Sequence, residues 1–310
     1  MGTSEGAGPQ LAGVPRRGAP LWLRGRELSP GRAAVMAVVN RTPDSFFPAA
    51  RAQDTDAALA QVAEAVQDGA DLVDIGGIRA GRGPRVGPAE EIDRVVPVVQ
   101  RVRAEFPDLP VSVDTWRSEV AEAVAAAGAD LINDTWAGHD PGVVGVAGRR
   151  GLGVVCSHTG GAVPRTDPLR PQYRGVGLDG VLQDVLGTVS RAAADAVAAG
   201  VDRRSVLVDA TLDFGKTTWH SLHLLRRTPA LVDLGYPVLV ALSRKDLVGE
   251  SLDLPVDERL EGSLAATAVA VWLGASAVRA HDVRATRRAV EMTAVIRGDL
   301  PPARAVRGLA

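Results

Sequence analysis

Apolar and polar positions recur along the chain in a repeating order. A short run rich in Val and Ile ends at a polar residue, a loop follows, and a longer stretch then shows the apolar spacing of a helix. The apolar runs cover residues 34–40, 71–75, 111–114, 130–133, 153–157, 206–209, 238–242 and 276–279. The helical stretches cover residues 54–67, 90–106, 118–127, 141–149, 179–199, 221–234, 257–273 and 284–296. The pattern predicts eight strands that alternate with eight helices.

This alternation predicts an α/β fold with parallel strand pairing, because parallel strands need crossover connections between them. The runs are almost continuously apolar, as in strands that are buried on both faces. Eight such units fit a single-domain (β/α)8 TIM barrel better than an open doubly wound sheet. We expect the barrel over residues 31–297, a disordered tail and leading segment over residues 1–30, and a C-terminal extension over residues 298–310.

Polar side chains stand at or just after the end of nearly every predicted strand. They are Asn40, Asp74, Asp114, Asn133, Asp134, His158, Asp209, Ser243, Arg244, Lys245, Arg279, His281 and Asp282. Active sites of such barrels lie at the carboxyl ends of the strands. A single Asp or Asn there can simply cap the next helix, but capping does not require Lys, Arg and His at the same mouth. The set therefore predicts a ligand site at this face.

Lysine is rare in this chain. Only Lys216 and Lys245 are lysines among 35 basic residues, and they follow the sixth and seventh predicted strands at the same face. Lysine carries a compact, rotatable ammonium that the planar fork of arginine does not replace. We therefore interpret Lys245, and after it Lys216, as candidate functional residues.

Composition excludes several other classes. The net charge of −2 gives no basic footprint for nucleic acid and no polybasic membrane signal. No apolar stretch is long enough to cross a bilayer. The single cysteine, Cys156, excludes an intramolecular disulfide framework and a cysteine-based zinc site, and it favours the reducing cytoplasm.

Six segments, in order, resemble signatures of the dihydropteroate synthase family. They are VMAVVNRTPDSFF (35–47), VSVDTWRSEVA (111–121), GADLINDTWAG (128–138), DFGKTTWH (213–220), YPVLVALSRK (236–245) and AVRAHDV (277–283). The similarity runs from about residue 33 to 297, and the C-terminus is similar to that of a second, divergent actinobacterial copy of the enzyme. The resemblance implies a homodimeric transferase of folate biosynthesis. Such an enzyme condenses 6-hydroxymethyl-7,8-dihydropterin diphosphate with p-aminobenzoate.

The resemblance also implies roles for individual residues. It assigns the pterin ring to Asp114, Asn133, Asp209, Phe214 and Lys245. It assigns the diphosphate and p-aminobenzoate side to Ser243, Arg279 and His281, and it makes Lys245, Arg279 and His281 catalytic. Asn40 would hold Mg²⁺ on the diphosphate, since this hard cation takes oxygen ligands and keeps waters. The side chains fit these roles. Carboxylates and an amide can hydrogen-bond to the amide, amino group and ring nitrogens of a pterin edge. Arginine can form a bidentate hydrogen-bonded pair with phosphate.

Two loops depart from the family pattern. After the second strand the family reads Gly-Gly-Glu-Ser-Thr-Arg-Pro-Gly, whereas residues 76–83 read GGIRAGRG. The usual Thr and Arg are thus Ala80 and Gly81, and Arg79 and Arg82 are out of register. In segment 209–216, Asp213 replaces a glycine, and we expect its carboxylate to repel anionic substrates.

Three functions follow from these observations. The first is a dihydropteroate synthase, and the second is a pterin-binding paralogue with weak or no synthase activity. The third is another pterin-dependent enzyme on the same barrel, of the methyltetrahydrofolate–corrinoid methyl-transfer type. The Ser-Arg-Lys motif at 243–245 and the Arg-x-His-Asp motif at 279–282 favour a pterin that carries a diphosphate, and the altered loops favour the second function over the first.

Overall fold

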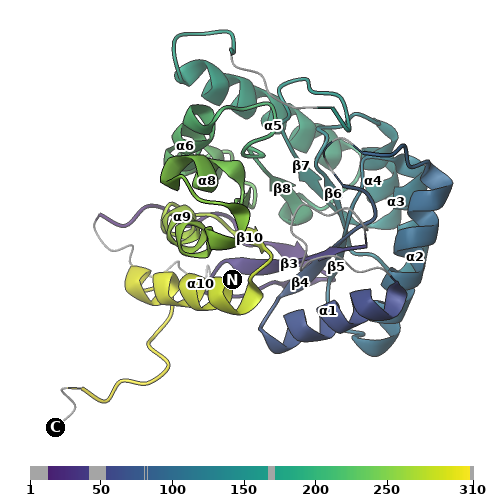
Figure 1. Ribbon diagram of the computed structural model, residues 1–310, viewed down its shortest axis with the longest axis horizontal. Coiled ribbons are helices and arrows are strands. Elements are labelled where there is room, and N and C mark those ends of the chain that lie inside the picture. Colours follow the sequence, from purple (N-terminus) through teal and green to yellow (C-terminus); the bar gives the residue numbers. More distant parts are fainter. Residues whose placement is uncertain (1–12, 42–53, 80, 82, 167–171, 308–310) are drawn as a thin grey trace, which may run out of the picture.

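The computed structural model describes residues 13–41, 54–79, 81, 83–166 and 172–307 of the chain. Within these residues, eight parallel strands form a ring that helices surround (Figure 1). The strands are β3 (Ala34–Asn40), β4 (Leu72–Gly76), β5 (Val111–Asp114), β6 (Leu131–Asp134), β7 (Gly153–Cys156), β8 (Val206–Val208), β9 (Leu239–Ala241) and β10 (Ala277–Ala280).

The ring of strands closes on itself. Hydrogen-bonded neighbours follow the order β8-β7-β6-β5-β4-β3-β10-β9. Val208 in β8 then forms a parallel bridge with Val238, just before β9, and its backbone N–H donates to the carbonyl of Pro237 at 2.9 Å. The predicted (β/α)8 barrel in a single domain is confirmed.

Helices follow the strands along the chain. They are α1 (Thr55–Gln67), α2 (Pro88–Glu105), α3 (Ser118–Ala127), α4 (Gly142–Arg150), α5 (Asp179–Ala198), α6 (Thr218–Arg226), α7 (Thr228–Val232), α8 (Asp246–Leu252), α9 (Leu260–Trp272) and α10 (Val283–Arg297). The helix expected over 221–234 is divided into α6 and α7, because Pro229 lacks an N–H and fits only the first turn of a new helix. Helix α8 was not predicted, and the helix expected from residue 257 begins only at Leu260.

Successive residues of each strand point alternately into the barrel and out toward the helices. In β3, Val35, Ala37 and Val39 join the core under the helices, while Ala34 and Met36 join a second core inside the barrel. The strand residues that complete this inner core are Leu72, Leu131, Val155, Leu207, Leu239 and Ala277. The inside of the barrel is therefore apolar toward the amino ends of the strands.

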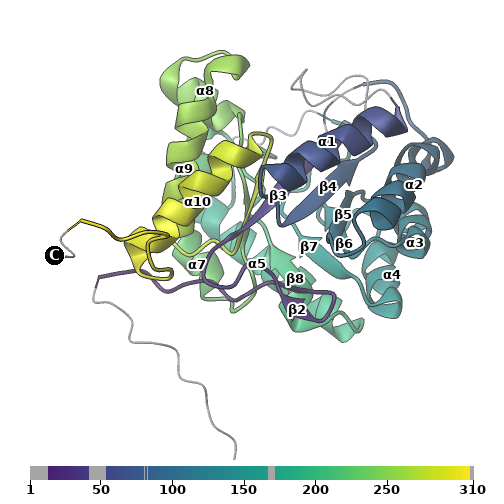
Figure 2. The same ribbon diagram turned by 90° about the horizontal axis from the view of Figure 1, so that it is seen from below.

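The segment before β3 covers the amino ends of the strands. Residues Trp22–Leu23 (β1) and Arg26–Glu27 (β2) pair as a short antiparallel hairpin. Leu21, Leu23 and Leu28 are buried in the inner core, and Figure 2 shows the segment running beneath β8. Part of the span 1–30, for which the sequence predicted a tail, is thus packed against the barrel, and we call residues 21–28 the bottom plug.

No helix within the described ranges is long and apolar enough to cross a membrane. This agrees with the absence of long apolar runs in the sequence.

Candidate functional site

A layer of polar side chains lies above the inner core, at the carboxyl ends of the strands. Because alternate residues share a face, the residue two positions after an inward-facing residue also points into the barrel. In chain order these polar residues are Asp74, Ser112, Asp114, Asn133, Asp209 and Arg279. We call them the polar layer. Among the described residues, the bottom plug covers the other end of the barrel, so the carboxyl ends of the strands are the side from which a ligand can approach this layer.

Asp74 joins the members of the polar layer to one another. Its side chain is completely buried. One carboxylate oxygen accepts from the Ser112 hydroxyl at 2.6 Å, and the other accepts from Asn133 Nδ2 at 2.9 Å and from Arg279 Nε at 2.6 Å. The sequence placed Asp74 at a strand end but gave it no role. Its position two residues after the inward-facing Leu72 is the signal that identifies it.

Asp114 lies beside this cluster and still touches solvent. Its carboxylate accepts from Arg279 at 3.3 Å and from the Thr135 hydroxyl at 3.2 Å. Burial raises the pKa of Asp114 above its ordinary value, and the charge of Arg279 acts in the opposite direction. Arg279 therefore sits between two carboxylates, those of Asp74 and Asp114, rather than being held by a single ion pair.

The opposite side of the polar layer carries Asp209 and Lys245. Burial raises the pKa of Asp209, and the nearby charge of Lys245 lowers it again. Lys245 Nζ donates to the carbonyl of Leu212 at 2.7 Å and lies 5.4 Å from the centre of the Phe214 ring. Burial lowers the pKa of Lys245. The arrangement presents a half-buried ammonium next to a buried carboxylate and an aromatic ring.

Lys216 holds together the segment that follows β8. Its ammonium donates to three carbonyl oxygens, those of His158 at 2.7 Å, Phe214 at 2.7 Å and Thr211 at 3.1 Å. Burial lowers its pKa to about 7. Since an ammonium has three hydrogens, Lys216 is fully used inside the protein and braces the loop instead of facing a ligand.

Asp213 does not point a free carboxylate at the mouth. Its two oxygens accept from the Ser221 hydroxyl and from the backbone N–H of Leu247, each at 3.0 Å. Its repulsion of anionic substrates, expected from the sequence, stays a prediction, and the geometry shows only that both oxygens already have donors within the protein. The acidic side chain points toward the donors of α6 and α8.

Three aromatic rings form a wall along one side of the mouth. Trp136 meets Phe214 edge-on with ring centres 5.5 Å apart, and Trp116 meets Trp136 edge-on at 6.2 Å. Trp116 and Trp136 are 6% and 2% exposed, and the Arg117 guanidinium lies 4.7 Å from the centre of the Trp116 ring. We call Trp116, Trp136 and Phe214 the aromatic wall. Its packing fixes the plane of Phe214, the ring next to Lys245.

The loop after β4 packs against the aromatic wall. Ile78 and Val86, near its two ends, are buried in the same apolar cluster. Arg117 donates to the carbonyl of Val86 at 2.9 Å, and Arg94 donates to the carbonyl of Gly77 at 2.9 Å. We call residues 77–87 the β4 loop.

A second arginine joins the β4 loop to the loop after β7. Arg165 donates to the carbonyl of Arg79 at 3.2 Å and to the carbonyl of Pro84 at 2.8 Å. Ala80 and Arg82 lie outside the described residues. The two loops are thus tied across the mouth through backbone carbonyls.

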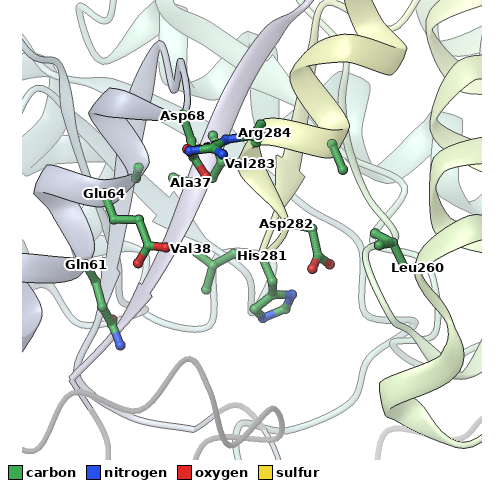
Figure 3. A pocket seen from close by; sticks show the side chains of 12 residues that line it. Ala37, Val38, Gln61, Glu64, Asp68, Leu260, His281, Asp282, Val283 and Arg284 are labelled. Carbon is green, nitrogen blue, oxygen red and sulfur yellow. Dashed lines mark hydrogen bonds and ion pairs between the residues drawn. The ribbon is translucent and has the colours of Figure 1, made fainter.

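The ends of β9 and β10 bring Ser243 and His281 together. His281 Nδ1 lies 3.3 Å from the Ser243 hydroxyl, and the His281 backbone N–H donates to that hydroxyl at 3.3 Å. Burial lowers the pKa of His281 to about 4, so its imidazole is neutral at pH 7. His281 lines a cavity of about 360 Å³. Figure 3 shows Gln61 and Glu64 of α1 on the other side of that cavity.

A family comparison agrees with this geometry. The model of the family described as "Pterin binding enzyme" matches residues 36–281. The chain belongs to the pterin binding enzyme family.

Its relatives within this family are dihydropteroate synthases and proteins named after them. The chain is 54% identical over 288 residues to "Inactive dihydropteroate synthase 2" of Mycobacterium tuberculosis, which covers 93% of this chain and 90% of the relative. It is 36% identical over 263 residues to the dihydropteroate synthase of Bacillus subtilis, with 84% and 87% covered. A Yersinia pestis dihydropteroate synthase solved as a sulfonamide drug complex matches with a TM-score of 0.83 and 35% identity, over 91% of this chain and 100% of that chain. This family member is dihydropteroate synthase-like in sequence and in fold.

In this member of the pterin binding enzymes, most of the predicted site residues gather at one mouth. Asp114, Asn133, Asp209 and Arg279 belong to the polar layer, and Phe214 and Lys245 border it. Ser243 and His281 form a pair at the ends of the neighbouring strands β9 and β10. Asn40 ends β3, where it lies in register with Gly76 of β4.

Two residues of the predicted motifs have structural roles instead. Arg244 forms a bidentate ion pair with the Asp282 carboxylate at 2.8 and 2.9 Å, and it also donates to the carbonyls of Val256 and Asp257. The conformation of Arg244 is left-handed, with φ of 55°. The Ser-Arg-Lys and Arg-x-His-Asp motifs therefore serve partly to lock β9, β10 and the loop before α9 together.

The remaining candidates stay outside the polar layer. Cys156 is buried, and burial raises the pKa of its thiol to about 12. His158 is buried with its Nε2 3.1 Å from an Asp184 oxygen, and burial lowers its pKa. Among the residues that the structure describes, no group of three His, Cys, Asp or Glu side chains is arranged to hold a metal ion.

Proposed function

We propose that this protein binds a reduced pterin that carries a diphosphate, and that it condenses this pterin with p-aminobenzoate weakly or not at all. The observation that carries the proposal is the contrast between two halves of the mouth. The polar layer with Lys245 is complete and internally braced, whereas the β4 loop departs from the family pattern and is tied down by Arg165.

The polar layer supports pterin recognition. Carboxylates only accept hydrogen bonds and lysine only donates them, so Asp114, Asp209 and Lys245 offer both kinds of partner to the amide, amino group and ring nitrogens of a pterin. Asn133 Nδ2 donates to Asp74, which fixes the orientation of that amide. The bond to Asp74 thus prepares Asn133 before any ligand arrives, and such preorganisation lowers the entropy lost on binding.

The second-substrate side supports weak turnover. In the synthase reaction the amine attacks a methylene carbon while diphosphate departs, so the protein contributes mainly positioning and charge stabilisation. The family's Thr and Arg, absent at Ala80 and Gly81, would serve this departing charge. The β4 loop also packs on the aromatic wall and is bonded to Arg165, Arg117 and Arg94. These contacts resist the loop movement that closing over a second substrate requires.

Magnesium fits the mouth only with help from the ligand. Asn40 supplies one amide oxygen at the end of β3, and the neighbouring position on β4 is Gly76, which has no side chain to fill the space between them. Mg²⁺ typically takes one or two protein oxygens plus phosphate oxygens and waters. The ion, when bound, would screen the diphosphate charge. Asn40 would be its protein ligand. The Arg279 guanidinium and the neutral imidazole of His281 would face the phosphates.

We also propose a homodimer, formed through helices late in the barrel. Helix α9 is apolar around most of its surface. On α9 and the adjoining α10, Val269, Met292 and Ile296 are 46%, 57% and 60% exposed. Light scattering at micromolar concentration is expected to give twice the chain mass of 32.2 kDa, and a monomer would exclude the dimer. A cytoplasmic location stays a prediction from the cysteine content.

One pair of measurements tests the function. Calorimetry with 6-hydroxymethyl-7,8-dihydropterin diphosphate and Mg²⁺ measures binding, and incorporation of radiolabelled p-aminobenzoate measures turnover. The Bacillus subtilis relative provides the positive control for both. We expect pterin binding with little incorporation. Turnover equal to the control would support a full synthase instead, and the absence of pterin binding would exclude both functions.

A further inference from the structure

Asp213 has a left-handed backbone conformation, which most residues other than glycine avoid and which Asp tolerates better than most. Its backbone φ is 71°, in the left-handed region that favours glycine. Its own N–H donates to the Ser221 hydroxyl at 3.0 Å, and that hydroxyl donates back to the carboxylate at 3.0 Å. The second carboxylate oxygen accepts from Leu247 N at 3.0 Å. We call residues 209–217, between β8 and α6, the β8 loop. The Asp213 side chain thus joins the β8 loop to α6 and to the first turn of α8.

This junction lies next to Lys245. Lys245 is the residue immediately before α8, with extended backbone angles of φ −72° and ψ 165°. Its ammonium donates to the carbonyl of Leu212, which precedes Asp213, and lies over the ring of Phe214, which follows it. Fixing Leu247 and the β8 loop therefore fixes both the backbone and the side chain of Lys245.

Asp213 also sets the electrostatic surroundings of that ammonium. The charged groups facing Lys245 come from three elements besides its own: Asp209 at the end of β8, Asp213 and Lys216 in the β8 loop, Arg279 on β10, and Asp246 on α8 itself. Burial lowers the pKa of Lys245, and among the charges that raise it again that of Asp213 has the largest effect, ahead of Asp209.

We propose that Asp213 is a positioning residue for Lys245: it anchors the start of α8 and supplies negative charge that holds the Lys245 ammonium at the pterin mouth. The consequence for pterin affinity rests on the proposed function, whereas the consequence for Lys245 itself does not. Asp213 then strengthens the pterin half of the mouth, in contrast to the repulsion expected from its sequence position.

The experiment uses the rarity of lysine in this chain. Selective isotope labelling of lysine gives two side-chain signals, from Lys216 and Lys245, and a Lys216→Arg variant assigns them. A pH titration by nuclear magnetic resonance then follows Lys245 directly, without any ligand. Asp213→Asn preserves the shape of the side chain and removes its charge, so we expect the Lys245 signal to titrate at lower pH than in the wild type.

Asp246→Asn is the matched control, because it removes an equal charge from the same end of α8. Asp246 is exposed and pairs with Arg259 at 2.9 Å, so its loss should move the Lys245 titration less than the loss of Asp213. A Lys245 titration that is unchanged in Asp213→Asn, or that moves equally in the two variants, would overturn the proposal.

A binding measurement separates this proposal from the proposed function. With the pterin diphosphate as probe, Asp213→Asn should bind about tenfold more weakly at a pH above the pKa of Lys245 in the variant. Lys245 has lost its charge there, and the loss corresponds to a hydrogen bond to a charged group. Below that pH the loss of affinity should be smaller. If wild type and variant both fail to bind pterin while the lysine titration shifts as expected, the function is wrong and the role of Asp213 stands. Equal affinities with an unshifted titration would overturn the role of Asp213 alone.

Discussion

At the residue scale, Lys216 in the loop after β8 and Lys245 just before α8 are the same residue type and use their ammonium groups differently. Lys216 places its three hydrogens on carbonyl oxygens of the protein. Lys245 donates to Leu212 at the edge of the mouth and remains half-buried beside Asp209. The scarcity of lysine signalled both residues, but only the three-dimensional structure separates Lys216, which braces the loop, from Lys245, which lies at the edge of the mouth.

The first prediction follows from this difference. Lys245→Ala should weaken pterin binding by about 1.5–3 kcal/mol, the scale of a hydrogen bond to a charged group. Lys216→Ala should weaken it less, since Lys216 reaches the ligand only through the loop. Calorimetry on the three proteins measures the effect, and an unchanged dissociation constant in the Lys245 variant would refute its assignment.

The second prediction concerns pH. Burial lowers the pKa of Lys216 to about 7 in the folded protein, whereas an unfolded lysine titrates near 10.4. Between about pH 7 and 10 the unfolded chain therefore binds more protons, so the contribution of Lys216 to the free energy of unfolding rises with pH. Lys216→Met lacks this contribution. We expect the free energy of unfolding of the wild type, minus that of Lys216→Met, to be larger at pH 9.5 than near pH 7 when both are measured by urea unfolding. A difference that is equal or smaller at pH 9.5 would contradict the assigned direction.

At the scale of elements, loops decide what the barrel can do. The strands deliver a fixed polar layer, and the β4 loop and the β8 loop determine what can approach it. The β4 loop lacks the Thr and Arg of the family and is bonded to Arg165. The β8 loop gains Asp213, which anchors α8. On the proposed function, the first departure weakens the second-substrate half of the mouth, and on the proposed role of Asp213 the second departure strengthens the pterin half.

The third prediction tests this division. Ala80→Thr with Gly81→Arg should raise synthase turnover, because one preorganised donor to a developing anion is typically worth about 10²–10³ in rate. Adding Arg165→Ala, which frees the β4 loop, should raise turnover further, while pterin affinity stays nearly constant. Asp213 is left in place because removing it would loosen Lys245. Incorporation of radiolabelled p-aminobenzoate measures the gain, and unchanged turnover in the triple variant would show that the β4 loop is not what limits the reaction.

Sequence periodicity predicted the barrel because its strands are buried on both faces and its helices on one. Elements too short to show a period were missed: the two-residue strands β1 and β2, and the seven-residue helix α8. The site residues were predicted from strand ends, since all strands of a parallel barrel end at one face. The direction of the Asp213 side chain was not predictable, because it depends on donors 8 and 34 residues away in the chain.

At the scale of the whole molecule, stability and function occupy opposite ends of the barrel. The amino ends of the strands are filled by the inner core and closed by the bottom plug. The carboxyl ends hold buried charges, whose desolvation opposes folding and is offset by hydrogen bonds within the polar layer. The inner core separates the polar layer from the amino ends of the strands.

The last prediction separates these two ends. Leu23 is 3% exposed in the bottom plug, where it packs into the inner core, so Leu23→Ala should lower the free energy of unfolding by about 2–5 kcal/mol. The same variant should leave pterin affinity unchanged, because no residue of the polar layer belongs to that core. Lys245→Ala should behave in the opposite way: it should lose pterin affinity and keep most of the free energy of unfolding. The removed charge is half-buried, and its desolvation offsets part of what it contributes to folding. Urea unfolding and calorimetry on both variants test the pair. A large loss of pterin affinity in Leu23→Ala, measured on folded protein, would show that the plug supports the mouth through the barrel and that the two ends are coupled.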